Sequence, residues 1–215
     1  MESPIAKAVF CDVNALGAAV PAPAPAPKLP SDFLPVPLVR QATPYSCGAA
    51  ALLSVLFYWQ VHDGGESSLY ERLQTTPKDG TEPPKLAEGA RSFGLEARVQ
   101  EGSSWEDLSA AFKRGETAIL GLQAWRTEET KKLAWKEDWD DGHYSVLVAL
   151  DENYAYFMDP SSSGVYAYIP REELLDRWHD FEDRRGVRRE YRNLAIFIKG
   201  KNPLKALPGP LLRME

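Results

Sequence analysis

The segment from Cys47 to Trp59, CGAAALLSVLFYW, constrains the fold more than any other part of this chain. As a helix it is apolar on nearly every side, which is typical of a helix buried all round rather than one with a solvent-facing side. Burying such a helix requires a core that surrounds it, and a chain of 215 residues with 44% hydrophobic residues is long enough to supply one. We therefore expect a globular domain built around this helix.

Prolines set apart the segment before that helix. Seven of the 17 prolines lie between Pro21 and Pro37, and their alternation with alanine favours an extended polyproline II spacer. No segment repeats at a fixed interval, so one domain is the simplest interpretation of the rest. The sequence thus predicts a flexible Ala/Pro-rich tail over residues 1–32, a single domain over 33–200 and a C-terminal extension over 201–215.

The hydrophobic pattern changes near the middle of this domain. Before Thr117 it predicts further helices at 68–73, 85–93 and 105–114, and a glycine that can end a helix follows each of the last two. After that point it predicts short strands, at 117–125, 144–150, 154–159, 165–169 and 194–198, with one more helix at 171–179. Helices followed by strands, without regular alternation, indicate an α+β fold with a largely antiparallel sheet.

Charge and cysteine content exclude several functional classes. With 25 Lys and Arg against 31 Asp and Glu, the net charge of −6 gives no electrostatic attraction to nucleic acid. No apolar run approaches the ~20 residues of a transmembrane helix. Two cysteines cannot form a disulfide scaffold, and common zinc, nucleotide and serine-hydrolase motifs are missing, so we expect no metal and no cofactor. Without a convincing signal peptide, a reducing cytoplasm is the expected compartment.

Cys47 is the first candidate for chemistry. It lies in the first turn of the predicted buried helix, where unpaired N–H groups and the helix dipole favour negative charge and lower the pKa of a thiol. Ser46 is positioned to cap that helix. A cysteine is also a small apolar residue suited to a core, and on Cys47 alone that interpretation stays open. If Cys47 is a nucleophile, Cys11 in the tail is the ordinary thiol.

A cysteine nucleophile requires a histidine base, and the chain has three histidines. His143 is the best placed of them, because it opens the predicted strand at 144–150. His62 follows the buried helix in a polar loop, and His179 falls in a charged helical segment. We expect both of these to be ordinary solvated or capping residues, which leaves His143 as the candidate base.

Asp159, which ends the next predicted strand, is the candidate acid that orients His143. If a three-residue loop at 151–153 joins the two strands, Asp159 lies opposite Ser145 and diagonal to His143 on the same face of the hairpin. A four-residue loop would send the two side chains to opposite faces. Taken alone, Asp159 is equally suited to capping the turn before Pro160.

Two further expectations complete the candidate site. The face of the hairpin with the smaller side chains, among them Ser145 and Leu147, is expected to pack on the helix that begins at Cys47. Gln41, six residues before Cys47, has a neutral amide that can donate to an oxyanion, and the Cys47 N–H would be the second donor. A polar glutamine in a loop is also an ordinary feature.

Taken together, these residues resemble a known family. The motifs are Gln41-Ala-Thr-Pro-Tyr-Ser-Cys47-Gly, then Gly142-His143-Tyr144 opening an apolar strand, then Met158-Asp159-Pro160 ending the next. In this order they resemble the bacteriocin-processing cysteine peptidases, the double-glycine leader peptidases of papain-like fold, over roughly residues 35–199. The resemblance implies a papain-like α+β fold in which a buried N-terminal helix carries the cysteine and packs on an antiparallel sheet.

The resemblance also implies a role for each residue. Cys47 would be the nucleophile, His143 the base, Asp159 its orienting acid and Gln41 the oxyanion donor. Ser46 stands where many members of the family have an acidic residue. The membrane helices and the ATPase of the transporter-linked members have no counterpart in this sequence, which indicates a stand-alone form.

These observations predict a cysteine peptidase that cleaves an extended peptide or leader segment by acyl-thioenzyme chemistry. Its partners would be a peptide or protein substrate and, by the resemblance, a separate transporter. Two alternatives remain open. The first is a papain-like acyl or peptidyl transferase, and the second is a catalytically silent peptide-binding module of the same fold.

Overall fold

The computed structural model describes residues 26–162, 164–184, 186–205 and 211–214. Most of the predicted tail, including Cys11, lies outside the described residues. Leu29 and Phe33 both pack against the core, so packing reaches into the last residues of the segment predicted as tail.

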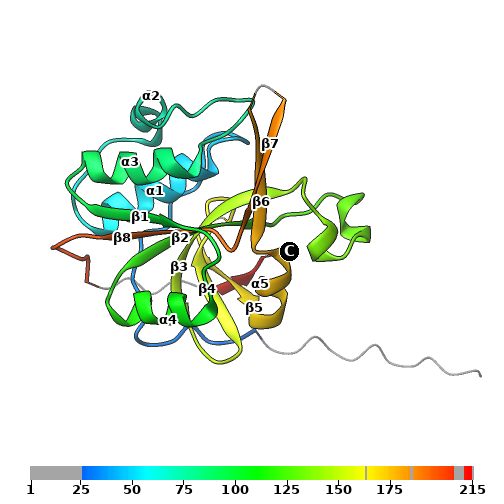
Figure 1. Cartoon of the computed structure of the whole chain (residues 1–215). Helices are drawn as coiled ribbons and strands as arrows, with labels where there is room; N and C mark the ends of the chain where they lie inside the picture. The colour runs from blue at the N-terminus through cyan, green and yellow to red at the C-terminus, as the bar shows by residue number, and fades with distance from the viewer. Residues whose placement is uncertain (1–25, 163, 185, 206–210, 215) are drawn as a thin grey trace, which may run out of the picture.

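A seven-stranded sheet forms the centre of the molecule (Figure 1). Neighbouring strands run antiparallel, except β5 and β9, which pair in parallel. In order across the sheet, the strands are β1 (Glu96–Gln100), β8 (Ala195–Lys199), β2 (Thr117–Gln123), β3 (Gly142–Leu150), β4 (Tyr154–Met158), β5 (Tyr166–Pro170) and β9 (Leu211–Arg213). The predicted α+β fold with a largely antiparallel sheet is confirmed.

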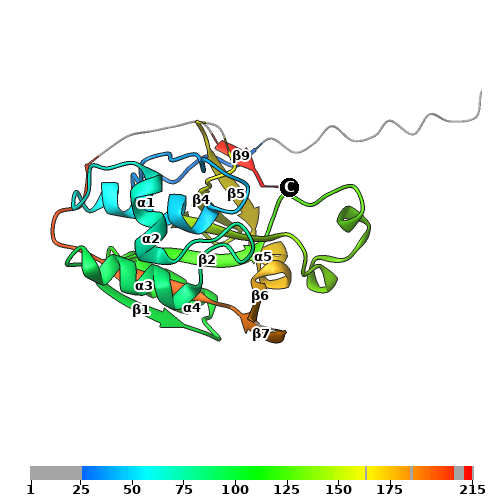
Figure 2. The same cartoon turned by 90° about the horizontal axis from the view of Figure 1, so that it is seen from above.

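Helices cover both faces of this sheet, and Figures 1 and 2 show them in two views. On the upper face in Figure 1 lie α1 (Cys47–Tyr58), the 3-10 helix η1 (Glu66–Leu69), α2 (Tyr70–Leu73) and α3 (Pro83–Ser92). The opposite face carries α4 (Trp105–Lys113) and α5 (Arg171–Arg177). The long connection from β2 to β3 contains the 3-10 helices η2 (Thr130–Lys132) and η3 (Trp135–Glu137).

Each face of the sheet has its own apolar core. Strand β2 shows the division, because Ile119 belongs to the core beneath α1, whereas Leu120 and Leu122 belong to the core beneath α4 and α5. Every residue of β2 is buried, as is typical of a strand covered on both sides. In α1, Leu52 and Leu56 are fully buried, and nearly all of that helix lies inside the first core. The predicted helix buried all round is thereby confirmed.

A second, two-stranded sheet is not predicted by the sequence. It is the hairpin of β6 (His179–Arg184) and β7 (Val187–Arg192), which Figure 1 shows standing upright beside the main sheet. The hydrophobic pattern gives no signal for it, because its strands are dominated by charged side chains. Contacts between those side chains stabilise the hairpin, for example the guanidinium of Arg188, which lies 3.9 Å from the centre of the Phe181 ring.

The predicted helix at 171–179 is two residues too long. Helix α5 ends at Arg177, and His179 begins β6. His179 is also buried rather than solvated, since its ring packs on Trp139 and its Nε2 lies 3.1 Å from the carbonyl oxygen of Trp135. The edge strand β1 is also not predicted, because its mostly exposed side chains lack an apolar run.

Candidate active site

Cys47, His143 and Asp159 lie together at one end of the sheet. Cys47 is the first residue of α1, His143 is the second residue of β3, and Asp159 directly follows β4. Nε2 of His143 lies 2.5 Å from Oδ1 of Asp159, and the Cys47 side chain is close enough to His143 to help raise the pKa of the ring. Because Nε2 is hydrogen-bonded to Asp159, Nδ1 is the ring nitrogen that can interact with the sulfur of Cys47. The histidine therefore bridges the thiol and the carboxylate.

The register of the β3–β4 hairpin brings these two side chains to the same face. As predicted, residues 151–153 separate the two strands, but beside this turn Leu150 pairs with Ala155 and not with Tyr154. A bulge at Val148 inserts one extra residue into β3. On the side of the bulge that leads to His143, the residues of β3 and β4 pair as predicted. His143 and Asp159 consequently share a face, as predicted, although by a different route.

The face of the hairpin that packs on α1 is the opposite of the predicted one. The core beneath α1 takes the larger alternate side chains of β3, namely Tyr144, Val146 and Val148. Leu147 points into the core on the other side. The small residues at the start of α1 explain this choice, because a Cβ on Gly48 would lie only 3.2 Å from the Tyr144 ring. Cys47 thus meets His143 at the end of the sheet, not inside the interface between helix and sheet.

Asp159 accepts hydrogen bonds on both of its carboxylate oxygens. Besides His143, Oδ1 accepts the hydroxyl of Ser145 at 3.1 Å, and Oδ2 accepts the indole N–H of Trp125 at 3.0 Å. The carboxylate is almost fully buried, so these donors replace the water that it loses. Trp125 is missing from the predicted site. The only sequence signal for it is its place at the end of the apolar run 117–125, which does not reveal where its indole N–H points.

The buried pair has strongly shifted protonation equilibria. Burial lowers the pKa of His143, but the charge and hydrogen bond of Asp159, followed by those of Cys47, outweigh burial and raise that pKa to about 10. Burial raises the pKa of Asp159, yet the charge and hydrogen bond of His143 bring it below its ordinary value. At neutral pH the site therefore favours an imidazolium at His143 beside an ionised Asp159.

The start of α1 differs from the prediction at Ser46. Its side chain makes no capping hydrogen bond to the helix. Its hydroxyl instead bonds the backbone and the side chain of Thr43, which closes the turn before the helix. Within the described residues, the N–H of Cys47 has no hydrogen-bond acceptor. It is therefore free to donate to a group bound at the sulfur, at the positive end of the helix.

Gln41 lies near the other three residues, but its amide is engaged elsewhere. Its Nε2 donates to the carbonyl of Thr43 at 2.7 Å, and its Oε1 accepts the hydroxyl of Ser161 at 3.0 Å. Gln41 lines a shallow hollow next to the cleft of Cys47, and Pro44 borders both. The structure thus brings Cys47, His143 and Asp159 together and leaves the Gln41 amide turned to its own loop.

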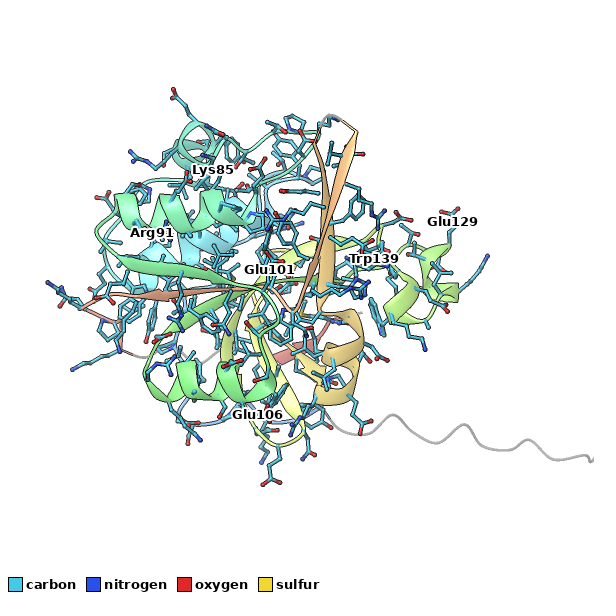
Figure 3. The ribbon with its side chains drawn as sticks, in the orientation of Figure 1. Lys85, Arg91, Glu101, Glu106, Glu129 and Trp139 are labelled. Carbon is cyan, nitrogen blue, oxygen red and sulfur yellow. The ribbon has the colours of Figure 1, made fainter. Side chains whose placement is uncertain are left out.

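Cys47 and His143 open into a cleft of about 320 Å³. One wall is the segment 78–83 that leads into α3, and the opposite wall is the β6–β7 hairpin. Trp139, labelled in Figure 3, lies beside this hairpin and borders the cleft.

The described residues contain neither a metal-ion site nor a membrane-spanning helix. Among them, no three side chains of His, Cys, Asp or Glu gather as ligands for a metal ion. No helix in the same part of the chain is both long and apolar enough to cross a membrane.

Comparison with known proteins agrees with this arrangement. The model of a family described as the Peptidase C39 family matches residues 35–181. The match spans Gln41, Cys47, His143 and Asp159. No curated protein matches the chain.

Several solved structures share the fold. A double glycine motif protease from an AMS/PCAT transporter, crystallised with the leader peptide, is 21% identical with a TM-score of 0.52, covering 79% of this chain and 94% of that one. The peptidase domain of Streptococcus ComA, a bi-functional ABC transporter involved in quorum sensing, is 19% identical with a TM-score of 0.51. The match covers 77% of this chain and 99% of that one. A C39-like peptidase from Bacillus anthracis is 15% identical with a TM-score of 0.56, covering 79% and 98%. The predicted papain-like fold is confirmed by these matches.

Proposed function

The chain belongs to the peptidase C39 family and is a cysteine peptidase, and we propose that Cys47, His143 and Asp159 are its catalytic triad. One observation carries the assignment of these residues. The His143 ring bridges the thiol at the start of α1 and the buried carboxylate after β4, at the floor of an open cleft. Nucleophile, base and orienting acid are thus arranged in the order that acyl transfer by a thiol requires.

The first half of the reaction makes a thioester. The Cys47 thiolate attacks the scissile carbonyl carbon, forming an S–C bond and an oxyanion. The His143 imidazolium then gives its proton to the amide nitrogen, the C–N bond breaks and the amine leaves. The raised pKa of His143 keeps the ring protonated for this step at neutral pH, and Asp159 holds the ring in place.

The second half hydrolyses the thioester. The neutral His143 takes a proton from water, and the resulting hydroxide attacks the acyl carbon. The S–C bond breaks, the carboxylate product leaves, and the thiolate and imidazolium are restored. In both halves, the N–H of Cys47 donates to the oxyanion. Gln41 is the second donor in this proposal, and its amide turns from the Thr43 carbonyl toward the cleft when substrate is bound.

The substrate in this proposal is an extended peptide or a leader segment. The open cleft supports it, and so does the similarity to a protease crystallised with a leader peptide. A reducing cytoplasm suits the reactive thiol of Cys47, and a separate transporter would receive the processed peptide. Both of these belong to the proposal.

A comparison of three proteins tests this function. Wild type, Cys47→Ala and the control Cys11→Ala are each incubated with a library of peptides, and new amino termini are identified by mass spectrometry. Cleavage by wild type and Cys11→Ala, and none by Cys47→Ala, is the expected result. Products joined to an added amine instead of to water would show a transferase. Tight peptide binding without any product would show a silent binding module.

A further inference from the structure

The walls of the cleft carry an excess of negative charge. Its charged lining consists of five carboxylates and one ammonium group, together with His143; they are Asp79, Glu82, Asp140, Asp180, Glu182 and Lys78. The ammonium of Lys78 is mostly exposed and lies 3.7 Å from the carboxylate of its neighbour Asp79. Any peptide that reaches Cys47 must therefore pass a strongly acidic surface.

Two of these carboxylates are fixed by strand β6. Asp180 and Glu182 are two residues apart, so both side chains point to the same face of the hairpin, toward the cleft. The carboxylate of Asp180 lies against Gly142, and a side chain at position 142 would overlap it. Because Gly142 directly precedes His143, Asp180 lies beside the strand end that carries the proposed base.

Both carboxylates have an oxygen without a hydrogen-bond partner in the described part of the chain. Oδ1 of Asp180 accepts the Phe181 N–H at 2.8 Å and the Gln123 amide at 3.4 Å, whereas Oδ2 accepts nothing. In Glu182, Oε1 accepts the hydroxyl of Tyr191 at 2.7 Å, and Oε2 is buried with no partner. A buried carboxylate oxygen that lacks a donor is costly, and a cation can remove that cost.

The raised pKa of Asp180 also indicates that its carboxylate would be stabilised by a nearby cation. Burial raises the pKa of Asp180 to about 7, and the charge of Glu182 adds to this, although the Phe181 N–H, Gln123 and the charge of His143 act in the opposite direction. The ionised carboxylate therefore lacks part of the stabilisation that it would have in water. A cation bound beside it would restore that stabilisation.

Three arginines of β7, namely Arg188, Arg189 and Arg192, are engaged with other groups. Arg189, which faces Glu182 across the hairpin, forms an ion pair of 2.7 Å with Glu101, the residue labelled near the base of the hairpin in Figure 3. Arg188 and Arg192 pair with Glu190 and lie over the Trp139 ring. These guanidinium groups leave the cleft side of Asp180 open.

We propose that Asp180 and Glu182 select peptide substrates that carry a lysine or arginine side chain next to the scissile bond. The cationic group would lie beside Oδ2 of Asp180 and close to the charge of Glu182, and the stem of the side chain would lie along Tyr191. This inference rests on the proposed function. The family match ends at residue 181, so Glu182 and β7 lie in a part of the chain that the match does not cover.

Matched peptides test the selection. A peptide that wild type cleaves is made with lysine, norleucine or glutamate at each position flanking the scissile bond, and kcat/KM is measured for each. At one of these positions, kcat/KM for the lysine peptide should exceed kcat/KM for the norleucine peptide by about tenfold or more. A charged hydrogen bond to a buried group contributes enough free energy for a difference of that magnitude. Glutamate should be cleaved most slowly there.

Variants assign the preference to the two residues. Asp180→Asn and Glu182→Gln each keep the shape of the side chain and remove its charge, and each should lower the ratio of lysine to norleucine several-fold. Glu190→Gln makes the same charge change on the side of the hairpin that faces away from the cleft, and should leave the ratio unchanged. Glu182→Lys should reverse the preference, so that the glutamate peptide has a higher kcat/KM than the lysine peptide.

The possible results separate this inference from the proposed function. Equal cleavage of lysine and norleucine peptides, with both abolished in Cys47→Ala, would overturn the selection and leave the peptidase assignment intact. A lysine preference that survives in both Asp180→Asn and Glu182→Gln would also overturn it. If no peptide of any kind were cleaved in a Cys47-dependent manner, the proposed function would fail and the selection with it.

Discussion

The His143 ring meets the Asp159 carboxylate because a bulge in β3 shifts the pairing of β3 with β4 by one residue. The pairing beside the turn, Leu150 with Ala155, would direct the two side chains to opposite faces of the hairpin if it continued along the strands. The extra residue, Val148, is fully buried in the core beneath α1, so the packing of that core maintains the bulge. The geometry of the site therefore depends on core packing several residues away from it.

Replacing Asp159 with asparagine should change the pH dependence of the reaction. The negative charge of Asp159 raises the pKa of His143, so in wild type the imidazolium persists up to about pH 10 and kcat/KM should fall as pH rises through that value. Without that charge, the pKa of His143 falls and the alkaline limb moves to lower pH. The rate at neutral pH should fall by roughly 10²-fold. The measurement is kcat/KM between pH 5 and 11.

Asp176→Asn is the control for that measurement, because it removes a carboxylate that is exposed on α5 and distant in the sequence from the site. Its profile should match that of wild type. An unchanged alkaline limb in Asp159→Asn would show that another group titrates there, and would remove His143 from the role of proton donor.

The two cysteines should differ in their reaction with iodoacetamide near pH 6. The positive charge of His143 beside Cys47 is expected to promote reaction at the sulfur, whereas a thiol in an ordinary setting has a pKa of about 8.5 and reacts slowly at that pH. Peptide mapping should find Cys47 labelled first and Cys11 later. In His143→Ala this difference should shrink markedly. Equal labelling of both cysteines in wild type would contradict the pairing of Cys47 with His143.

Much of this site follows from local sequence patterns. The apolar run after Cys47 predicts α1, and the short β-rich runs predict β3 and β4, so three of the site residues are correctly placed at the ends of elements. Their convergence depends on the bulge at Val148, for which the sequence has no local signal. The predicted position of His143 relative to Asp159 is therefore correct, while the predicted pairing of Leu150 with Tyr154 is not.

Other features depend on contacts that no local pattern encodes. Trp125 reaches Asp159 from the end of β2, 34 residues away in the chain. The charged hairpin that carries Asp180 lacks the apolar alternation by which strands are identified, because it packs its side chains on one another. The helix at 171–179 is predicted too long for the same reason, since the charged start of β6 continues the helical pattern.

Gln41→Ala should lower kcat by roughly 10²-fold to 10³-fold with little change in KM, if Gln41 donates only to the oxyanion. Gln41→Glu has nearly the same shape but no amide donor, so it should be at least as impaired. Ser161→Ala removes the hydroxyl that holds Oε1 of Gln41 and should leave most of the activity. Steady-state kinetics on a single peptide measure all three. A rise in KM alone would mean that Gln41 binds the substrate instead.

Trp125→Phe should act on both stability and rate, because it removes the N–H that satisfies Oδ2 of Asp159 and keeps most of the ring. A buried carboxylate oxygen left without a donor costs about 1–3 kcal/mol, which urea unfolding would measure. The matched control is Trp135→Phe, since the indole of Trp135 contacts two guanidinium groups and its N–H makes no hydrogen bond within the described residues. If Trp125 also positions the carboxylate, kcat should fall several-fold with KM unchanged, under conditions where both variants are fully folded. A loss of stability with wild-type kcat would instead limit Trp125 to a structural role.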